Sequence, residues 1–462
     1  MERIDTGFIN HERLNQQIEG ANAPTSSELS DILTKAREMK GIDLMEVLTL
    51  LNVEDLQDLE QIFQTADEIK HQIYGKRMVL FAPLYISNVC YNEGLYCGFR
   101  KSNCDIKRKT LTMDEIERDT KALINDGHKR ILLVSGEGDR ESALQFTCRA
   151  IEKIYATSTE KGNIRRINVN IAPPDVEGFK LLKERGIGTY QLFQETYDHK
   201  TYRRMHPSGK KSNYLHHLTA MDRAMQGGID DVGLGVLFGL HDPKFEVLAL
   251  MTHIQHLEKN YGVGCHTISV PRIEPADNSP LSLNPPFPVD DLSFKKIIAI
   301  LRIAVPYTGI ILSTRENQKI RREAIKLGIS QISAGSKTDP GGYSNGMSAS
   351  QFSLGDHRSL GEVIDDLLEM GYIPSFCTGC YRKNRTGADF MDLAKPGLIQ
   401  HYCFQNGLTS FQEYLSNFAD KNLFQKGQTV IAEKAGQLPA SQREALLQNL
   451  ELIKQGQKDI YI

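Results

Sequence analysis

From about Met78 onward, short apolar runs alternate with amphipathic helical stretches, and this alternation limits most strongly what the chain can fold into. We predict eight strands: VLFAPLYIS, RILLVSG, INVNIAP, TYQLFQE, DVGLGVLFG, HTISVPRI, GIILSTRE and QISAGS. Runs that are apolar on both faces indicate buried parallel strands, which helical crossovers connect. Eight such units over about 260 residues match the size of a (β/α)8 barrel. An open doubly wound sheet is the alternative architecture.

The segments on either side of the alternating region have helical patterns. Thr25 and Glu28 form a predicted capping box, and the helical spacing of apolar residues after it ends at Gly41. We place an N-terminal helical segment at 1–76, the barrel at 77–355 and a helical C-terminal domain at 356–462. The N-terminal segment shows no residues that indicate chemistry, which favours a packing or lid role.

Charge and composition narrow the classes of function. The formal net charge of −3 argues against binding nucleic acid or an anionic membrane. No stretch approaches the roughly 20 apolar residues of a membrane helix. The first residues are polar and acidic, unlike a secretory or transit peptide, so we expect a cytoplasmic location. Eight cysteines, clustered along the chain, indicate metal binding rather than a disulfide framework.

Three cysteines near the C-terminal end have the spacing of metal ligands. Cys377 and Cys380 form a C-x2-C pair, and Cys403 follows after 22 intervening residues. Three thiolates suit an iron–sulfur cluster with one open iron, or a zinc ion with a fourth ligand from elsewhere. The spacing alone leaves both possibilities open, together with a purely structural role.

A second cysteine pair follows the first predicted strand. Cys90 and Cys97 lie on this loop, with Gly94 between them, and Cys104 comes after a further six residues. Catalytic residues of a (β/α)8 barrel lie at the carboxyl ends of its strands, which is where this loop begins. Cys104 could be a third ligand, but an incidental loop thiol is the simpler interpretation.

Other polar residues also fall at ends of predicted strands. Ser135, Gly136 and Glu137 end the second strand in a small-residue turn that a ligand could approach, and Glu137 could accept hydrogen bonds from an ammonium group. Arg315 could bind a carboxylate through two N–H groups, although pairing with Glu316 would give the same pattern. The remaining members of this set are Glu195, His266 and Ser333. A lone histidine such as His266 is more often a hydrogen-bonded core residue than a ligand.

Taken together, these features resemble the radical S-adenosylmethionine (SAM) enzymes, and among them the HydG-type tyrosine lyases of [FeFe]-hydrogenase assembly. The resemblance lies in PLYISN-C…YCGFR, QLFQETY, MHPSGKKS, AMDRAMQGGIDDVGLGVLFGL, GCHTISVPRIEPA and SLGEVIDDLLEMGYIPSFCTGCYRKNRTGADFM. The C-x2-C-x22-C spacing in and after the last stretch is its most specific part. The related thiazole-pathway tyrosine lyase, 2-iminoacetate synthase, shares the barrel but lacks this tail.

The resemblance implies an activity and its cofactors. A [4Fe–4S] cluster in the barrel would reduce SAM to a 5′-deoxyadenosyl radical that attacks the substrate tyrosine. Cleavage of the Cα–Cβ bond would give p-cresol and dehydroglycine. An auxiliary iron–sulfur cluster would convert the fragment to carbon monoxide and cyanide, with hydrogenase maturation proteins as partners.

The resemblance also assigns roles to individual residues. Cys90 and Cys97 would bind the barrel cluster, and Arg315 and Ser333 would bind tyrosine. The residues near SAM would be Tyr96, Ser135, Gly136, Glu137 and Glu195. The auxiliary cluster would be held by Cys377, Cys380 and Cys403, with His266 reaching its labile iron.

The chain departs from this family pattern at three positions. Gly94 stands where the middle cysteine of the barrel cluster loop is expected. The pattern would also have His in place of Asp198 and Arg in place of His217. A second hypothesis is therefore a catalytically impaired paralogue that keeps only the C-terminal cluster and acts as a carrier or regulator. A third is the thiazole-pathway lyase.

Overall fold

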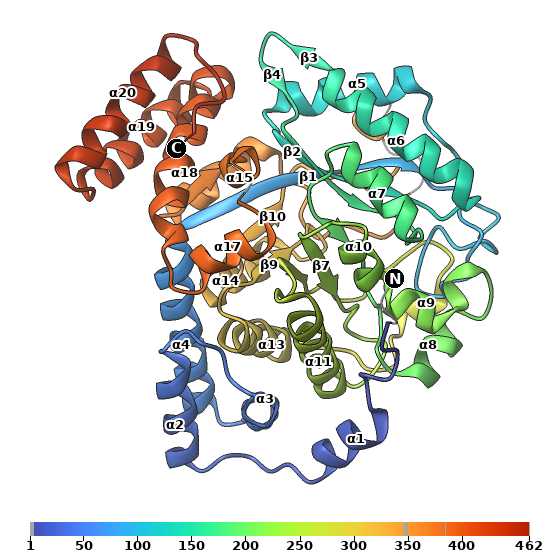
Figure 1. The fold of residues 1–462 in the computed structure, drawn as a ribbon. Coiled ribbons are helices and arrows are strands. Elements are labelled where there is room, and N and C mark those ends of the chain that lie inside the picture. The colour runs from blue at the N-terminus through green and yellow to red at the C-terminus, as the bar shows by residue number, and fades with distance from the viewer. Residues whose placement is uncertain (1–3, 345, 347–349, 384, 462) are drawn as a thin grey trace.

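The computed structural model describes residues 4–344, 346, 350–383 and 385–461, and its centre is a closed parallel barrel (Figure 1). Hydrogen bonds between the first and last strands close the ring, so the barrel prediction is confirmed over the open sheet. All eight predicted strands are present. They are β1 (Arg77–Ser87), β2 (Arg130–Ser135), β5 (Arg166–Asn170), β6 (Tyr190–Gln191), β7 (Val232–Gly235), β8 (Thr267–Ser269), β9 (Gly309–Leu312) and β10 (Gln331–Ser333).

Strand β1 is the longest because it has three partners at different heights. Residues 77–79 pair with β11 (Ile373–Ser375), residues 79–81 with β10, and residues 82–87 with β2. The sequence did not predict β11, which is three residues long and contains Pro374. This extra strand joins the C-terminal segment to the barrel wall and leads directly into Cys377. A short hairpin, β3 (Ser158–Thr159) and β4 (Gly162–Asn163), was also not predicted.

Helices form the outer layer of the barrel. They are α5 (Met113–Asp126), α6 (Arg140–Ala156), α7 (Val176–Glu184), α8 (His199–Met205), α9 (Tyr214–Leu218), α10 (Ala220–Gln226), α11 (Pro243–Tyr261), α12 (Pro280–Leu283), α13 (Asp291–Ala304) and α14 (Gln318–Leu327), with a 3₁₀ turn at Lys210–Ser212. Thr112 caps α5 in a capping box with Glu115. Gly127 ends α5 with φ of 106°, and a Cβ there would lie 2.5 Å from the Tyr414 ring. Glycine therefore permits both the turn and the close contact with the C-terminal helices.

The N-terminal segment packs against the outer helices of the barrel. It comprises α1 (His11–Glu19), α2 (Ser26–Ala36), α3 (Leu44–Leu51) and α4 (Leu56–Tyr74). The capping box of Thr25 and Glu28 is confirmed at the start of α2. Helix α4 packs on α13 and α14, and α3 packs on α11 and α13. Leu48, Ile62 and Ile69 are fully buried in these contacts, which supports the packing role.

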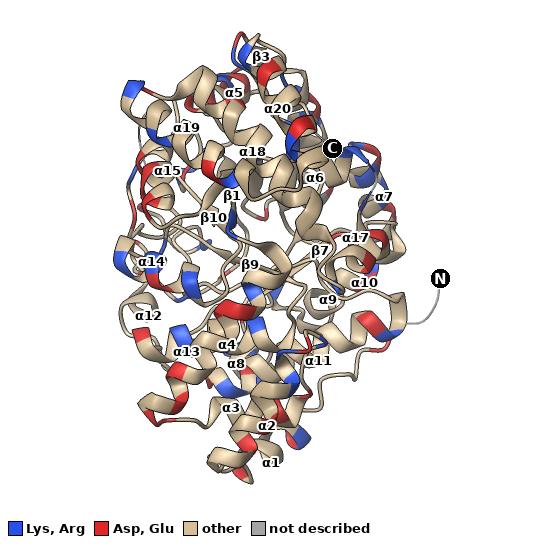
Figure 2. Cartoon of the chain, turned by 90° about the vertical axis from the view of Figure 1, so that its left-hand side faces the viewer, with Lys and Arg blue, Asp and Glu red and all other residues tan. Residues whose placement is uncertain are grey.

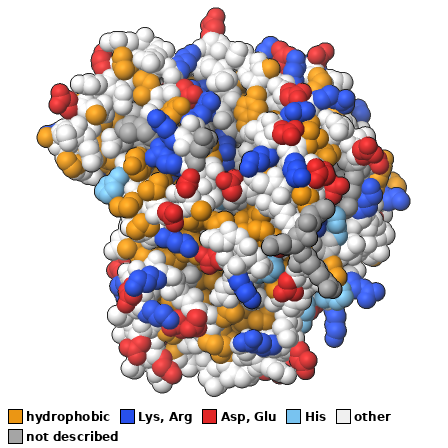
Figure 3. Space-filling view, viewed as in Figure 1, with side chains coloured by type: hydrophobic (Ala, Val, Ile, Leu, Met, Phe, Trp, Pro, Cys, Tyr) orange, Lys and Arg blue, Asp and Glu red, His pale blue; other side chains and the backbone are white. Residues whose placement is uncertain are grey.

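The C-terminal segment packs beside the amino-terminal end of β1. Its helices are α15 (Leu360–Glu369), α16 (Gly379–Arg382), α17 (Gly387–Ala394), α18 (Ile399–Phe418), α19 (Lys421–Gly436) and α20 (Ala440–Lys454). Helix α18 lies against β11, while α19 and α20 form a lobe at the upper left (Figures 1 and 3). Acidic and basic residues are interspersed over the helices visible in Figure 2. Within the described residues, no helix is long and apolar enough to cross a membrane.

Candidate functional site

A cavity of about 220 Å³ lies at the carboxyl ends of the barrel strands. It gathers side chains from loops that are far apart in the sequence. The upper-site residues expected from the sequence all line it, namely Cys90, Tyr96, Cys97, Ser135, Gly136, Glu137, Glu195, Arg315 and Ser333. We call this the upper cavity. The geometry of a (β/α)8 barrel explains the convergence, since its strands end on one face.

The cysteine loop contributes two thiols to the upper cavity, with Gly94 between them. Cys90 and Cys97 are half-buried, whereas Cys104 is exposed and does not line the cavity. The φ of Gly94 lies outside the left-handed region. A Cβ at Gly94 would lie 3.5 Å from Cζ of Tyr96 and 3.8 Å from Cβ of Cys97, which is ordinary van der Waals contact. The loop therefore has the space and the backbone conformation for a side chain at position 94.

Close backbone contacts hold this loop against the end of β2. A Cβ at Gly136 would lie 2.5 Å from the carbonyl oxygen of Val89, so only glycine permits the approach. The N–H of Tyr91 donates to the carbonyl oxygen of Glu137 at 2.8 Å. Asn92 donates a hydrogen bond to the Glu137 carboxylate. The Ser-Gly-Glu turn and the cysteine loop thus form one unit.

A lysine and a histidine support the residues expected near SAM. Glu195 has a left-handed backbone (φ 68°), and Oε1 of its carboxylate lies 2.6 Å from Nζ of Lys211. Oη of Tyr96 lies 2.8 Å from Nε2 of His206. The sequence reasoning did not single out Lys211 and His206. Both belong to the MHPSGKKS stretch, whose resemblance to the family could have indicated them.

Arg315 and Ser333 follow β9 and end β10, respectively. The Arg315 guanidinium carbon lies 3.3 Å from the centroid of the Phe352 ring, stacked on its face. The hydroxyl of Ser333 accepts a hydrogen bond from the N–H of Thr314 at 3.0 Å. A Cβ at Gly355 would lie 2.3 Å from the carbonyl oxygen of Arg315, so this loop is tightly packed from outside.

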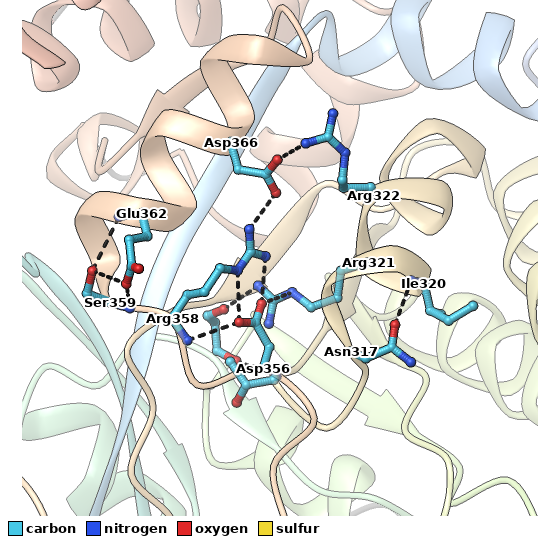
Figure 4. Close-up of polar contacts among 11 residues, drawn as sticks. Asn317, Ile320, Arg321, Arg322, Asp356, Arg358, Ser359, Glu362 and Asp366 are labelled. Atoms are coloured by element: carbon cyan, nitrogen blue, oxygen red, sulfur yellow. Dashed lines mark hydrogen bonds and ion pairs between the residues drawn. The ribbon is translucent and has the colours of Figure 1, made fainter. Parts of the chain in front are cut away.

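Figure 4 shows an ion network around Asp356, formed with Arg321 and Arg358. The carboxylate of Asp356 pairs with Arg321 at 3.2 Å and with Arg358 at 2.7 Å. Arg321 donates to the carbonyl oxygen of Ser333 at 2.7 Å, and the N–H of Asp356 donates to the carbonyl oxygen of Thr314 at 3.1 Å. The network therefore fixes the ends of β9 and β10, from which Arg315 and Ser333 reach the cavity.

The other two departures from the family pattern occupy different places. His217 lines the upper cavity, and its Nε2 lies 2.8 Å from the carbonyl oxygen of Phe193. Burial and then Lys211 keep the pKa of His217 well below its usual value. Asp198 instead caps α8, accepting the N–H of Thr201 at 2.7 Å, and it is not among the described residues that line the cavity. Of these three positions, Gly94 and His217 line the cavity.

The three C-terminal cysteines lie at the opposite end of the barrel, beside the start of β1. The thiol of Cys380 donates a hydrogen bond to the sulfur of Cys403. This bond, together with Arg77 and Arg385, lowers the pKa of Cys403, although burial acts in the opposite sense. The sulfur of Cys377 accepts the N–H of Gly379 at 3.2 Å. We call these three cysteines and their neighbours the lower site.

His266 lies at the same end, where the C-terminal segment contacts the barrel. Its buried Nδ1 has no hydrogen-bond partner but lies 3.6 Å from Oδ1 of Asp231. Its Nε2 lies 3.2 Å from the hydroxyl of Tyr381, next to Cys380 in the chain. Asp231 also accepts the N–H of Gly387 at 3.1 Å. The sequence reasoning missed Asp231 and Tyr381, whose roles depend on the tertiary contact.

The two thiol sets differ in how well they fit an iron–sulfur cluster. The lower site offers three thiols beside Arg77 and Arg130, and such cations suit the negative charge of thiolates and cluster sulfides. Within the described residues, no three His, Cys, Asp or Glu side chains meet closely enough to hold one metal ion. Cluster thiolates bind different irons and need not meet at one point. The upper cavity offers two thiols, and the set that a three-thiolate cluster needs is incomplete.

Comparison with known proteins gives matches over the whole chain. Residues 84–253 match the model of the radical SAM superfamily, and residues 269–373 match the biotin and thiamin synthesis associated domain. The 2-iminoacetate synthase of Escherichia coli is 33% identical over 318 residues, which covers 68% of this chain and 82% of that enzyme. These matches imply iron–sulfur and SAM chemistry in this family of folds.

Two solved structures extend the likeness to both ends of the chain. A crystal structure of HydG, described as a maturase of the [FeFe]-hydrogenase, is 48% identical with a TM-score of 0.96, covering 99% of this chain and 100% of that one. HydG from Carboxydothermus hydrogenoformans is 42% identical with a TM-score of 0.84, covering 95% and 97%. The chain belongs to the HydG family of radical SAM proteins.

Proposed function

We propose that this chain carries the two sites of a HydG-type tyrosine lyase, which cleaves tyrosine to p-cresol and dehydroglycine and converts the fragment to carbon monoxide and cyanide. The observation that supports it most is whole-chain likeness to HydG at 48% identity, including the segment with the three C-terminal cysteines. The 2-iminoacetate synthase match covers 68% of the chain, which disfavours the thiazole-pathway alternative. Hydrogenase maturation proteins would then be the recipients of the product.

In this proposal the upper cavity binds SAM and tyrosine side by side. The Glu137 carboxylate would accept the ammonium group of SAM, at the turn where Gly136 brings the backbone against Val89. Tyr96 and Glu195 would line the adenosine side, held by His206 and Lys211. Arg315 and Ser333 would bind the tyrosine carboxylate, with Arg315 oriented by the Phe352 ring. Because the thiol set is incomplete, we derive no step through a barrel cluster.

The lower site would hold the auxiliary iron–sulfur cluster through Cys377, Cys380 and Cys403. A bound cluster of this kind can supply an iron that coordinates small ligands such as carbon monoxide and cyanide. His266 would reach that iron through Nε2, and the hydroxyl of Tyr381 now lies at this atom. A carboxylate beside the other ring nitrogen favours the tautomer with Nε2 free, and Asp231 has that position. The same proposal divides the chain into an N-terminal helical segment (1–76), the barrel (77–355) and the C-terminal domain of the auxiliary cluster (356–462).

A second function is supported by one specific observation, the missing donor at position 94. A chain with a complete lower site and an incomplete upper one could bind the C-terminal cluster alone and act as a carrier or regulator. In that case the upper cavity would keep its shape but lose radical initiation.

Electron paramagnetic resonance (EPR) separates these two functions. The protein would be reconstituted with iron and sulfide without oxygen, reduced, and measured with and without SAM, followed by an assay for p-cresol. Two cluster signals, one of which shifts with SAM, together with p-cresol formation would support the lyase. A single signal that ignores SAM and is lost in Cys377→Ala would instead support the carrier or regulator.

A further inference from the structure

Glu274 carries a carboxylate with no partner into the upper cavity. It belongs to the PRIEPA stretch after β8 and is half-buried in the cavity wall. No hydrogen bond or ion pair joins it to any of the described residues. Its neighbours differ in this respect, since Arg272 pairs with both Glu316 and Asp291. Burial, and next the charge of Glu316, raise the pKa of Glu274 to about 7.

Arg315 is the complementary charge in the same cavity. Its guanidinium stacks on Phe352 and forms no ion pair with a described carboxylate. Arg315 and Glu274 are close enough for each charge to act on the pKa of the other, yet they form no salt bridge. Partly buried charges without partners are costly, because neither water nor protein replaces their solvation fully. A ligand with both charges would relieve both costs.

The other carboxylates in the cavity are already engaged. Glu195 pairs with Lys211, and Glu137 accepts from Asn92 in the turn that holds the cysteine loop. Among the described residues that line the cavity, Glu274 is therefore the acidic group that remains for a second ammonium group. The cavity wall includes the aromatic and aliphatic side chains of Phe81, Tyr85, Phe193, Leu237, Ile273 and Phe352. Such a wall suits the side chain of an aromatic amino acid.

We propose that Glu274 binds the α-ammonium group of a zwitterionic amino acid whose carboxylate is bound by Arg315. This rests on the proposed function and adds to it a binding residue and the charge pattern of the substrate. Such a ligand would bridge the Arg315 guanidinium and the Glu274 carboxylate, which form no salt bridge with each other. An aromatic acid without the amine, or an aromatic amine without the acid, would satisfy only one of the two charges.

Calorimetric titration of the reconstituted full chain in the presence of SAM tests this with three ligands. These are tyrosine, 3-(4-hydroxyphenyl)propionate, which lacks the ammonium group, and tyramine, which lacks the carboxylate. Glu274→Gln should weaken tyrosine binding by roughly 10- to 100-fold, the range for a hydrogen bond to a charged group, and leave the propionate unchanged. Arg315→Gln should weaken tyrosine and the propionate but leave tyramine unchanged.

Glu141→Gln is the matched control, because Glu141 is exposed on α6 outside the cavity, and its affinities should equal those of the wild type. Equal weakening of tyrosine and the propionate in Glu274→Gln would overturn the proposal, since it would indicate a general distortion of the cavity. No change for either ligand would overturn it as well. Absence of saturable tyrosine binding to the wild type would overturn both the proposed function and this assignment. If the wild type binds tyrosine but Glu274→Gln does not weaken tyrosine binding more than propionate binding, only the assignment of Glu274 would be overturned.

Discussion

The upper cavity and the lower site differ in which part of a cluster site they retain. Among the described residues, the upper cavity has a tightly packed loop but only two thiols, whereas the lower site has three thiols. The upper cavity keeps the close packing of Gly136 on Val89 and the bond from Asn92 to Glu137, yet its loop offers two thiols with Gly94 between them. The lower site has all three cysteines, two of which, Cys380 and Cys403, share a thiol–thiol hydrogen bond. The loop shape at the upper end is thus maintained by backbone and neighbouring contacts that need no side chain at position 94.

The largest difference between the two sites is expected when one thiol of the lower site is removed. Cys377→Ala should lose the iron bound at the lower site, because cluster assembly there needs each of the three thiolates. Iron analysis and EPR after reconstitution would measure this. Cys104→Ala is the control, since that exposed thiol lies outside the upper cavity, and its iron content should not change. Full iron retention in Cys377→Ala would place the iron elsewhere and invert the comparison.

The next largest effect is expected behind the upper cavity. Asp356→Asn leaves Arg321, which is 1% exposed, without its anion, and loss of one partner of a buried pair costs about 3–5 kcal/mol. Urea unfolding should show this loss, and tyrosine affinity should fall because β9 and β10 end at this network. Asp365→Asn breaks only the exposed pair with Lys426 and should cost less than about 1 kcal/mol. Equal stability of the two variants would show that the network is not structural.

A third thiol at position 94 would test whether the upper cavity can then support SAM cleavage. Gly94→Cys should raise SAM cleavage by at least about 100-fold, or roughly 2.7 kcal/mol of barrier, because the loop already has room for the side chain. Release of 5′-deoxyadenosine is the measurement. Gly94→Ser has similar size but no thiol and should stay at the background rate. A folded Gly94→Cys protein without SAM cleavage would shift attention to His217, the other change in the cavity wall.

The smallest effect is a pH dependence confined to the upper cavity. Binding of an ammonium group needs ionised Glu274, whose raised pKa of about 7 follows from burial and Glu316 and is opposed by Arg315 and Arg272. A raised carboxyl pKa leaves the group protonated below pH 7, so tyrosine affinity should rise roughly tenfold between pH 6 and pH 8. Titration over this range would show it. The dependence should vanish in Glu274→Gln, and persistence there would assign it to another group.

The sequence predicted the barrel well because its strands are apolar runs between capped helices. Strand β11 was missed since three residues with a proline carry too little pattern, although it determines where Cys377 lies. Residues at the carboxyl ends of strands, such as Arg315 and Ser333, were found because a barrel brings those ends to one face, whereas His266 precedes β8 and lies at the other end. Glu274 was missed because nothing local distinguishes it from Glu316, which is paired. The space beside Gly94 and the position of Asp198 outside the cavity depend on packing, which no spacing of residues reveals.

Strand β1 has a consequence for spectroscopy. The ten steps from Arg77, beside the lower cysteines, to Ser87, close to the cysteine loop of the upper cavity, extend roughly 33 Å at about 3.3 Å each. Dipolar coupling between two unpaired spins falls with the cube of their separation. Paramagnetic centres at the two ends of β1 should therefore give EPR spectra that add without broadening each other. Each end can then be quantified in the presence of the other.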